Sequence, residues 1–392
     1  MGTHLVVHVL SARWLSSAEY GEFAIAFMLY QIGYVVHNAL VGEPMLVLGA
    51  SMFEVSSQAY QRILVRFHGV GLGLTMVMGV GALAVGTSVA QASRILSLSA
   101  IPAAVVAMLA VPLVRRRAFV EGNPSAAASV GSIYFVVTLT MLVGLRALEG
   151  RYLAWMPWLA LTLGGLVAAT TVWTVLDRRQ ERGEGRARPQ DVLAAHWDIG
   201  RWLVVAGLVG FLVSGLNPVV IGFLAGMEAV GEYRAILNLA TPGLQGSGSL
   251  LLLLIPYLAR MDEATLLRSY RQMLVGFAAV WLVYLVVVVG LARPAVAIVY
   301  GADHYQAAQG TIIGAAALPL FYLPLGLGGA LLKSVGRARE FSSVAVFAGL
   351  VGVFGSIPLV LVLGVPGAFY STCLAYAAGG AWMSFRVREY FN

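Results

Sequence analysis

Four polar side chains follow one face of an apolar stretch at residues 233–258: Arg234, Asn238, Thr241 and Gln245. Their spacing fits the helical repeat, so they form one stripe, with Leu, Ile, Ala and Gly on the other faces. Polar groups are costly against hydrocarbon, so the stripe should face protein or a water-filled cavity. A guanidinium grips phosphate through two parallel hydrogen bonds, which makes Arg234 a candidate contact for a diphosphate. The alternative is that Arg234 lies one turn from the membrane surface and extends its head group into water.

A second polar set lies in the apolar stretch at residues 20–48 and comprises Tyr30, Gln31, Tyr34, His37 and Asn38. Gln31 and Asn38 are two helical turns apart on one face, so they are candidates to line a cavity. The three rings form a neighbouring stripe that could stack on sugars. Ordinary hydrogen bonding between helices is the alternative for both faces.

Two further positions are candidates for coupling or gating. Glu43, followed by Pro44, is an acid deep in the same stretch, which suits proton or sodium coupling or a gate that pairs with a cytoplasmic arginine. The alternative is a broken helix end, because Pro44 removes a backbone donor and disfavours helix for the residue before it. Asn217-Pro218 predicts a bend in the stretch 202–225, either a hinge or a static kink.

Membrane helices must position these side chains, because the composition excludes an ordinary soluble domain. Hydrophobic residues make up 59% of the chain and charged residues 11%, against about 25% charged in soluble domains. We expect an all-α polytopic membrane protein with about 12 transmembrane helices in two six-helix lobes. The apolar stretches lie near residues 1–12, 20–48, 63–89, 95–114, 125–145, 153–176, 202–225, 233–258, 272–292, 308–332, 341–363 and 366–385.

The first stretch is too short for a span, since crossing the hydrocarbon takes about 20 residues. A signal peptide would need a basic start and a small-residue cleavage site, and neither is present. We therefore expect a truncated first helix, through a wrongly assigned initiation codon or a real truncation.

The basic residues predict the topology. Nineteen of the 25 fall in alternate loops that include the polar segment 177–200 and the carboxyl terminus, which places these in the cytoplasm. The segment separates an N-terminal lobe, 1–176, from a C-terminal lobe, 201–392. We expect it to be a solvated linker whose end, from Val192 to Ile199, forms a short helix at the membrane surface.

A trace of duplication supports the two lobes. Gly21-Glu22-Phe23 begins the second stretch and Gly231-Glu232-Tyr233 the eighth, 210 residues later. Parallel repeats of six helices would enter the membrane in the same orientation. With this offset, Gln31 corresponds to Thr241, so two polar faces are expected opposite each other across a central cavity.

Four motifs resemble polysaccharide transporters of the multidrug/oligosaccharidyl-lipid/polysaccharide exporter superfamily, and they lie at 13–23, 299–308, 331–337 and 364–368. The first, Arg-Trp-Leu-Ser-Ser-Ala-Glu-Tyr-Gly-Glu-Phe, is similar to the segment after the first helix of these proteins. The resemblance implies a flippase with about twelve helices in two lobes around a central cavity, which carries undecaprenyl-diphosphate-linked oligosaccharide across the inner membrane. It also implies lipid contacts and, as partners, polymerase and chain-length machinery for O-antigen or exopolysaccharide. The short first helix departs from the family, in which that helix lines and gates the cavity.

Nothing in the sequence indicates an enzyme. Lys333, the only lysine, has no phosphate-binding loop around it, and neither His-Glu-x-x-His nor Gly-x-Ser-x-Gly occurs. The single cysteine, Cys373, excludes a disulfide within the chain, and we expect no cofactor and no metal. The net charge of +7 is explained by arginines that face anionic lipid, so no nucleic acid is expected.

Three other functions stay open. A drug or cation exporter of the same superfamily would favour acids in its cavity, and Glu43 is the one clear intramembrane acid. A polymerase or ligase of polysaccharide assembly would have a large non-cytoplasmic loop, whereas the outer loops here are short. A membrane scaffold would need neither the repeat nor the paired polar faces.

Overall fold

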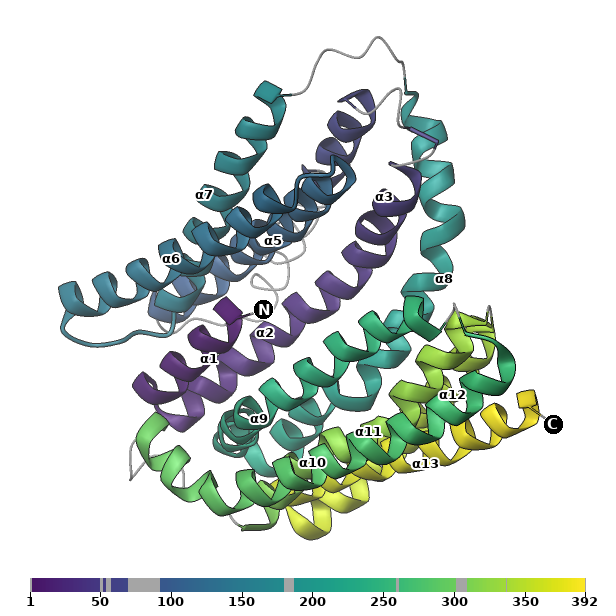
Figure 1. Ribbon diagram of the computed structural model, residues 1–392. Helices are drawn as coiled ribbons and strands as arrows, with labels where there is room; N and C mark the ends of the chain where they lie inside the picture. Colours follow the sequence, from purple (N-terminus) through teal and green to yellow (C-terminus); the bar gives the residue numbers. More distant parts are fainter. Residues whose placement is uncertain are drawn as a thin grey trace. The chain divides into compact units, whose positions relative to one another are not determined.

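The computed structural model describes residues 2–49, 52–53, 58–69, 92–179, 187–258, 261–300, 309–335 and 337–391. These ranges are helical apart from short turns, and no β-strand occurs in them (Figure 1). The helices are α1 (Gly2–Trp14), α2 (Ser17–His37), the π-helical turn η1 (Asn38–Gly42), α3 (Glu43–Leu48), α5 (Ala92–Val120), α6 (Pro124–Glu149), α7 (Met156–Arg179), α8 (Pro189–Gly215), α9 (Asn217–Leu258), α10 (Glu263–Tyr300), α11 (Gln309–Ser334), α12 (Ala338–Leu363) and α13 (Val365–Phe391).

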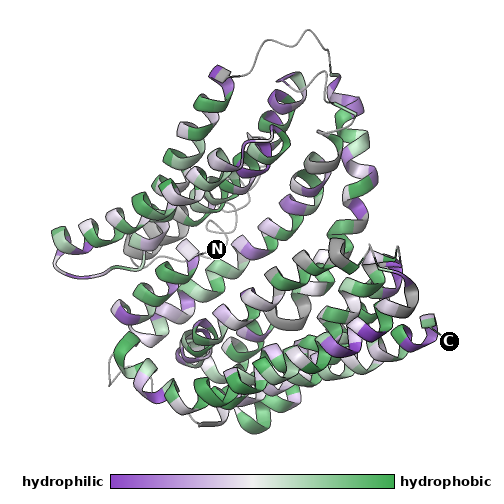
Figure 2. Ribbon diagram, in the orientation of Figure 1, coloured by the Kyte–Doolittle hydropathy of each residue, from purple (hydrophilic) through white to green (hydrophobic). Residues whose placement is uncertain are grey.

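The expectation of an all-α membrane protein is confirmed. Six helices of the described ranges are long and apolar enough to cross a membrane, or seven if the bent pair formed by Pro189–Arg201 and Leu203–Phe211 is one span. Hydrophobic residues cover most turns of the helices (Figure 2). Most of the third expected stretch, the middle of the linker (180–186) and the motif at 301–308 lie outside the described residues.

The contacts divide the chain into two compact units, and the first helices are shared between them. Unit 1 consists of residues 1–7 and 26–207, and unit 2 of residues 8–25 and 208–392. In unit 1, α5, α6 and α7 pack on one another, and in unit 2, α11 packs on α9, α10, α12 and α13. The bounds of these units differ from those of the expected lobes, because residues 8–25 belong to unit 2 and residues 201–207 belong to unit 1.

In unit 1, the end of the linker is a docked helix. Residues 192–199 are helical as expected, but they belong to the longer α8, which begins at Pro189, and their location at the membrane surface stays a prediction. Val192 is fully buried in a cluster that includes Met45, Tyr60 and Leu113. On the same face, His196 lies 2.8 Å from the Leu40 carbonyl and 2.7 Å from the Tyr60 hydroxyl. The carbonyl can only accept, so Nδ1 donates to it, and in the neutral imidazole Nε2 accepts from Tyr60. Leu193 and Trp197 remain exposed.

In unit 2, the seventh stretch is broken as the Asn-Pro pair predicts. α8 ends at Gly215, α9 begins at Asn217, and Gly226 interrupts α9 with a φ of 86°. Such a backbone conformation suits glycine. The stretch expected at 202–225 is therefore the end of α8 together with the first turns of α9, and the stretch at 233–258 is the rest of α9.

Candidate functional site

The predicted stripe lies along α9, and its members differ in what they contact. Asn238 is buried, and its amide donates a 2.8 Å hydrogen bond to the Tyr20 hydroxyl on α2. Thr241 donates to the Leu237 carbonyl of its own helix. Gln245 is half-buried. Cavity lining by the stripe stays a prediction.

Arg234 and Asn238 belong to one hydrogen-bonded network with two residues from the start of the chain. The Nη2 atom of Arg234 lies 3.5 Å from His8 Nε2, and His8 Nδ1 lies 3.2 Å from the Tyr20 hydroxyl. Arg234 Nε is buried and has no hydrogen-bond partner among the described residues. A guanidinium has five donors in a planar fork, so this one has capacity left for an oxyanion.

His8 and Tyr20 were missed by reasoning from the sequence, although one signal was available. A histidine in an apolar stretch is itself a costly polar group that needs a partner. The spacing of residues around His8, however, does not indicate that its partners lie on α2 and α9.

Two glycines of the repeat bring these helices together. A side chain at Gly21 would overlap the carbonyl of Met227, and a side chain at Gly231 would overlap the carbonyl of Ser17. Both positions must therefore be glycine for the backbones to approach this closely. α2 itself begins with a capping box, in which Ser16 and Glu19 each bond the other's backbone N–H.

The aromatic stripe of unit 1 lies in a cluster of protein rings. Tyr30 is buried, with ring centroids 5.1 Å from Phe27, 5.2 Å from His4 and 6.2 Å from Tyr34. Stacking of this ring on a sugar would require the cluster to open. Tyr34 is half-buried and is the more available of the two tyrosines.

The residues after this stripe form a polar group at the π-helical turn. Arg116 donates to Asn38 Oδ1, and Asn38 Nδ2 donates to Glu43 at 2.9 Å. The exposed Glu43 therefore reaches an arginine through Asn38. His37 Nε2 lies 3.1 Å from Nδ1 of His68. π-Helical turns are rare and frequently mark functional sites.

The roles expected for Gln31 and for the pair Asn217-Pro218 stay predictions. Gln31 is half-buried on α2, and its correspondence with Thr241 stays a prediction. Asn217 is buried and fully engaged: it donates to the Ala368 carbonyl and to Thr372, and accepts from Ser356. With Pro218 beside it, this side chain fixes the start of α9 against α12 and α13 in unit 2.

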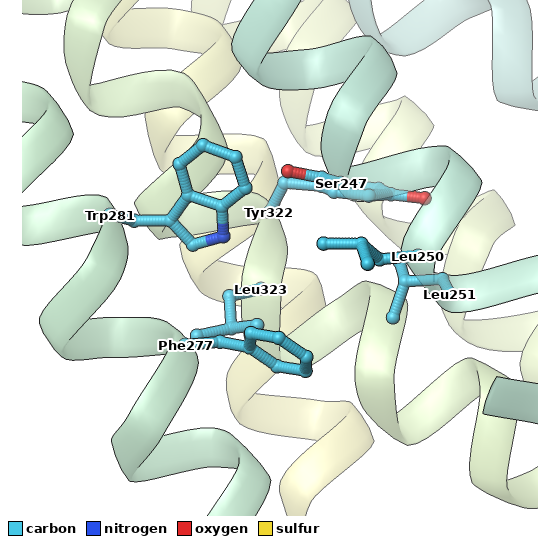
Figure 3. Close-up of a pocket in the computed structure, with 7 residues that line it drawn as sticks. All are labelled: Ser247, Leu250, Leu251, Phe277, Trp281, Tyr322 and Leu323. Carbon is cyan, nitrogen blue, oxygen red and sulfur yellow. The ribbon is translucent and has the colours of Figure 1, made fainter. Parts of the chain in front are cut away.

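Unit 2 also holds a small apolar pocket of about 10 Å³ among α9, α10 and α11 (Figure 3). The rings of Phe277, Trp281 and Tyr322 surround it, and Ser247 donates its hydroxyl to the Gly243 carbonyl. Its lining is apolar and its space is about that of one water molecule, so it does not suit a charged head group. Within the described ranges, no three His, Cys, Asp or Glu side chains come together in a way that could hold a metal ion.

Long apolar helices in two compact units define a multi-pass helical membrane protein. The chain belongs to the polysaccharide biosynthesis protein family, whose model matches residues 10–309. Among curated proteins, none matches it in sequence.

Solved transporter structures share its fold. An inward-facing multidrug resistance MATE family transporter of the MOP superfamily superposes with a TM-score of 0.80 and 11% identity, over 99% of this chain and 94% of that one. The lipid II flippase MurJ, in an inward closed conformation, gives 0.75 and 11%, over 98% and 85%. The Vibrio cholerae MATE transporter VcmN, in its bent form, gives 0.60 and 14%, over 99% and 94%. The fold is thus the two-lobe transporter fold that the resemblance implied.

Proposed function

We propose that the chain is a flippase that moves polyprenyl-diphosphate-linked oligosaccharide across the inner membrane for O-antigen or exopolysaccharide synthesis. Its family is named for polysaccharide biosynthesis, and a lipid II flippase shares its fold. The observation that carries the choice of substrate is Arg234, a cation with a buried unpaired donor at the head of the α9 stripe. A diphosphate supplies the oxyanions that such a group lacks.

Arg234, Asn238, Thr241 and Gln245 on α9 would grip the head group, with Gln31 and Asn38 as the matching face of the other repeat. Tyr30, Tyr34 and His37 would contact sugars, Glu43 would serve coupling or gating, and Asn217-Pro218 would shape the break between α8 and α9. Membrane lipid, and in the cell polymerase and chain-length machinery, would be the partners. No step of this transport makes or breaks a covalent bond.

The test is export of surface polysaccharide from cells that carry single variants. Arg234→Ala should abolish export while the protein still reaches the membrane, and Arg234→Lys should restore it in part, because an ammonium lacks the planar fork. Arg293→Ala, at an exposed position on α10, is the matched control and should export normally. Asn238→Ala and Gln31→Ala should have weaker effects, since neutral hydrogen bonds contribute about 1 kcal/mol and those to charged groups about 1.5–3. Normal surface polysaccharide in the Arg234→Ala strain would overturn the head-group assignment.

Glu43→Gln separates energy coupling from substrate binding, because it keeps the shape of the side chain and removes its charge. Lipid-linked oligosaccharide should then accumulate in the inner leaflet with binding intact. The second candidate function is a cation-coupled drug exporter, which the shared fold of the MATE transporters favours. A complete deletion decides between the two. Normal polysaccharide in that strain, with no second copy of the gene, would promote the exporter.

The proposed orientation places the linker and the carboxyl terminus in the cytoplasm. Gln190 is exposed near the start of α8, so a cysteine there, in a chain with Cys373 replaced, should resist labelling from outside intact cells. Efficient labelling would reverse the topology.

A further inference from the structure

His8 is held between a polar group on α2 and a charged group on α9. It is 2% exposed, and its ring lies edge-on to Tyr20 and Phe23 at centroid distances of 6.0 and 5.1 Å. One ring nitrogen faces Arg234, the other faces Tyr20, and the Tyr20 hydroxyl also accepts from Asn238. The four residues come from three helices, so this chain of contacts ties α1, α2 and α9 together within unit 2.

The donors fix the protonation state of the imidazole. A guanidinium can only donate, so His8 Nε2 must be the unprotonated nitrogen that accepts from Arg234. Nδ1 then carries the proton and donates to the Tyr20 oxygen. The arrangement in the structure therefore requires a neutral histidine of one defined tautomer.

Protonation would break the contact with Arg234 and leave the contact with Tyr20 intact. A proton on Nε2 removes the acceptor and places two positive groups 3.5 Å apart. The other charged groups on these segments, Arg13, Glu19, Glu22, Glu228 and Glu232, occupy exposed or half-buried positions. Of the titratable or charged side chains, Tyr20 and Arg234 contact the two ring nitrogens of His8.

We propose that His8 is a positioning residue that holds Arg234 in the network while neutral, and that its protonation releases the guanidinium for an anionic ligand. A neutral imidazole at 3.5 Å is a weak acceptor, and a phosphate oxygen is a stronger one. An imidazolium beside the freed guanidinium adds a second cationic donor for the same anion. The release of Arg234 to an anionic ligand rests on the proposed function of that residue. The pH sensitivity of the contact between His8 and Arg234 does not depend on it.

Hydrogen exchange of the purified full chain in nanodiscs tests the contact. The readout is the protection of backbone amides at residues 8–25 and 227–238 from pH 8 to pH 5, corrected for intrinsic exchange rates. In the wild type, protection should fall by up to about tenfold per pH unit while His8 titrates, as expected for opening linked to one proton. His8→Gln keeps an acceptor for Arg234 and a donor for Tyr20 but does not titrate, so its protection should stay level. Constant protection in the wild type, or an unchanged pH response in His8→Gln, would overturn the proposal.

A second histidine in α1 provides the matched control. His4 lies one turn away and contacts the Tyr134 hydroxyl at 3.0 Å in unit 1. His4→Gln should keep the wild-type pH response at 8–25. If it abolishes that response, His4 and not His8 is the sensor, and the proposal fails.

Anion release is tested separately with inorganic pyrophosphate as the probe, by thermal shift at pH 5.5 and pH 8. The affinity at pH 5.5 divided by the affinity at pH 8 should be larger for the wild type than for His8→Gln. The comparison with His8→Gln corrects for titration of the pyrophosphate itself. Equal ratios would overturn the release step. Loss of export in Arg234→Ala tests the flippase function. If export is instead normal, the hydrogen-exchange test of the contact between His8 and Arg234 is unaffected.

Discussion

Gly21 and Gly231 occupy reciprocal positions in one helix contact of unit 2. Gly21 meets the carbonyl of Met227, and Gly231 meets the carbonyl of Ser17. Each glycine is 210 residues from its counterpart, and Ser17 and Met227 are also 210 residues apart. The two repeats therefore contact each other through the same surface, as the subunits of a twofold dimer do. This relationship explains why both repeats place glycine before Glu-aromatic.

The reciprocal contact predicts equal sensitivity at both glycines. Gly21→Ala and Gly231→Ala should each lower the free energy of unfolding by about 1–3 kcal/mol, because the added methyl meets backbone that cannot rotate away. Thermal unfolding of the purified protein measures the change. Gly144 on α6 has open space around it, so Gly144→Ala should be neutral or stabilise the helix by up to about 1 kcal/mol. Similar losses at all three positions would show that the contact has no special role.

Periodicity predicted the helices and the shared face of the α9 stripe, and the Asn217-Pro218 pair predicted the break after α8, because these features depend on neighbours within a few turns. The partners of the stripe were not predictable. His8 and its partner Arg234 are 226 residues apart, and no local pattern records which distant helix covers a polar face. The division of α1 and α2 between two units was missed for the same reason, since each helix is continuous in sequence.

The arginine run at 115–117 shows what the sequence alone cannot predict, namely the different surroundings of three adjacent arginines. From the sequence it indicates a membrane-surface anchor or an attractant for lipid head groups. On a helix, however, successive residues point about 100° apart. Arg115 is therefore exposed, Arg116 bonds Asn38, and Arg117 is fully buried. Three identical residues have three different surroundings.

Asn217 is predicted to be a structural pin at the start of α9. Asn217→Leu has a similar size but leaves the hydroxyl of Ser356 without its partner and removes both donors to α13. A buried polar group that loses its partner costs about 1–3 kcal/mol, so thermal stability should fall by at least that amount. Ser129→Ala on the exposed face of α6 is the control. Full stability with altered export would instead identify a hinge.

The docked helix at the start of α8 should respond to acid. Burial lowers the pKa of His196, and the hydrogen bond with the Leu40 carbonyl opposes this to a smaller extent. A group whose pKa is lowered by folding stabilises the fold fully above its ordinary value, about 6.5 for histidine. That contribution declines as the pH falls below this value. The melting temperature should therefore drop between pH 7 and pH 5 more steeply in the wild type than in His196→Gln. Parallel curves for the two proteins would contradict this role.

Arg117 should be the most sensitive charged position of unit 1. Its guanidinium lies 2.7 Å from Glu121, 2.7 Å from Asp177 and 4.0 Å from the ring centroid of Trp173, so it joins α5 to α7. Removal of one partner from a buried ion pair costs about 3–5 kcal/mol, and Asp177 is half-exposed, so Arg117→Ala should fall toward the lower end of that range. Arg117→Lys should be intermediate, because a single ammonium cannot bond both carboxylates and stack on the indole. Chemical unfolding of the purified protein gives the free energy of unfolding of the wild type, Arg117→Ala and Arg117→Lys. The neighbouring Arg115→Ala should stay within about 0.5 kcal/mol of the wild type, as exposed substitutions do. If Arg117→Ala is equally mild, the ion pairs do not hold α5 and α7 together, and the run is a surface anchor after all.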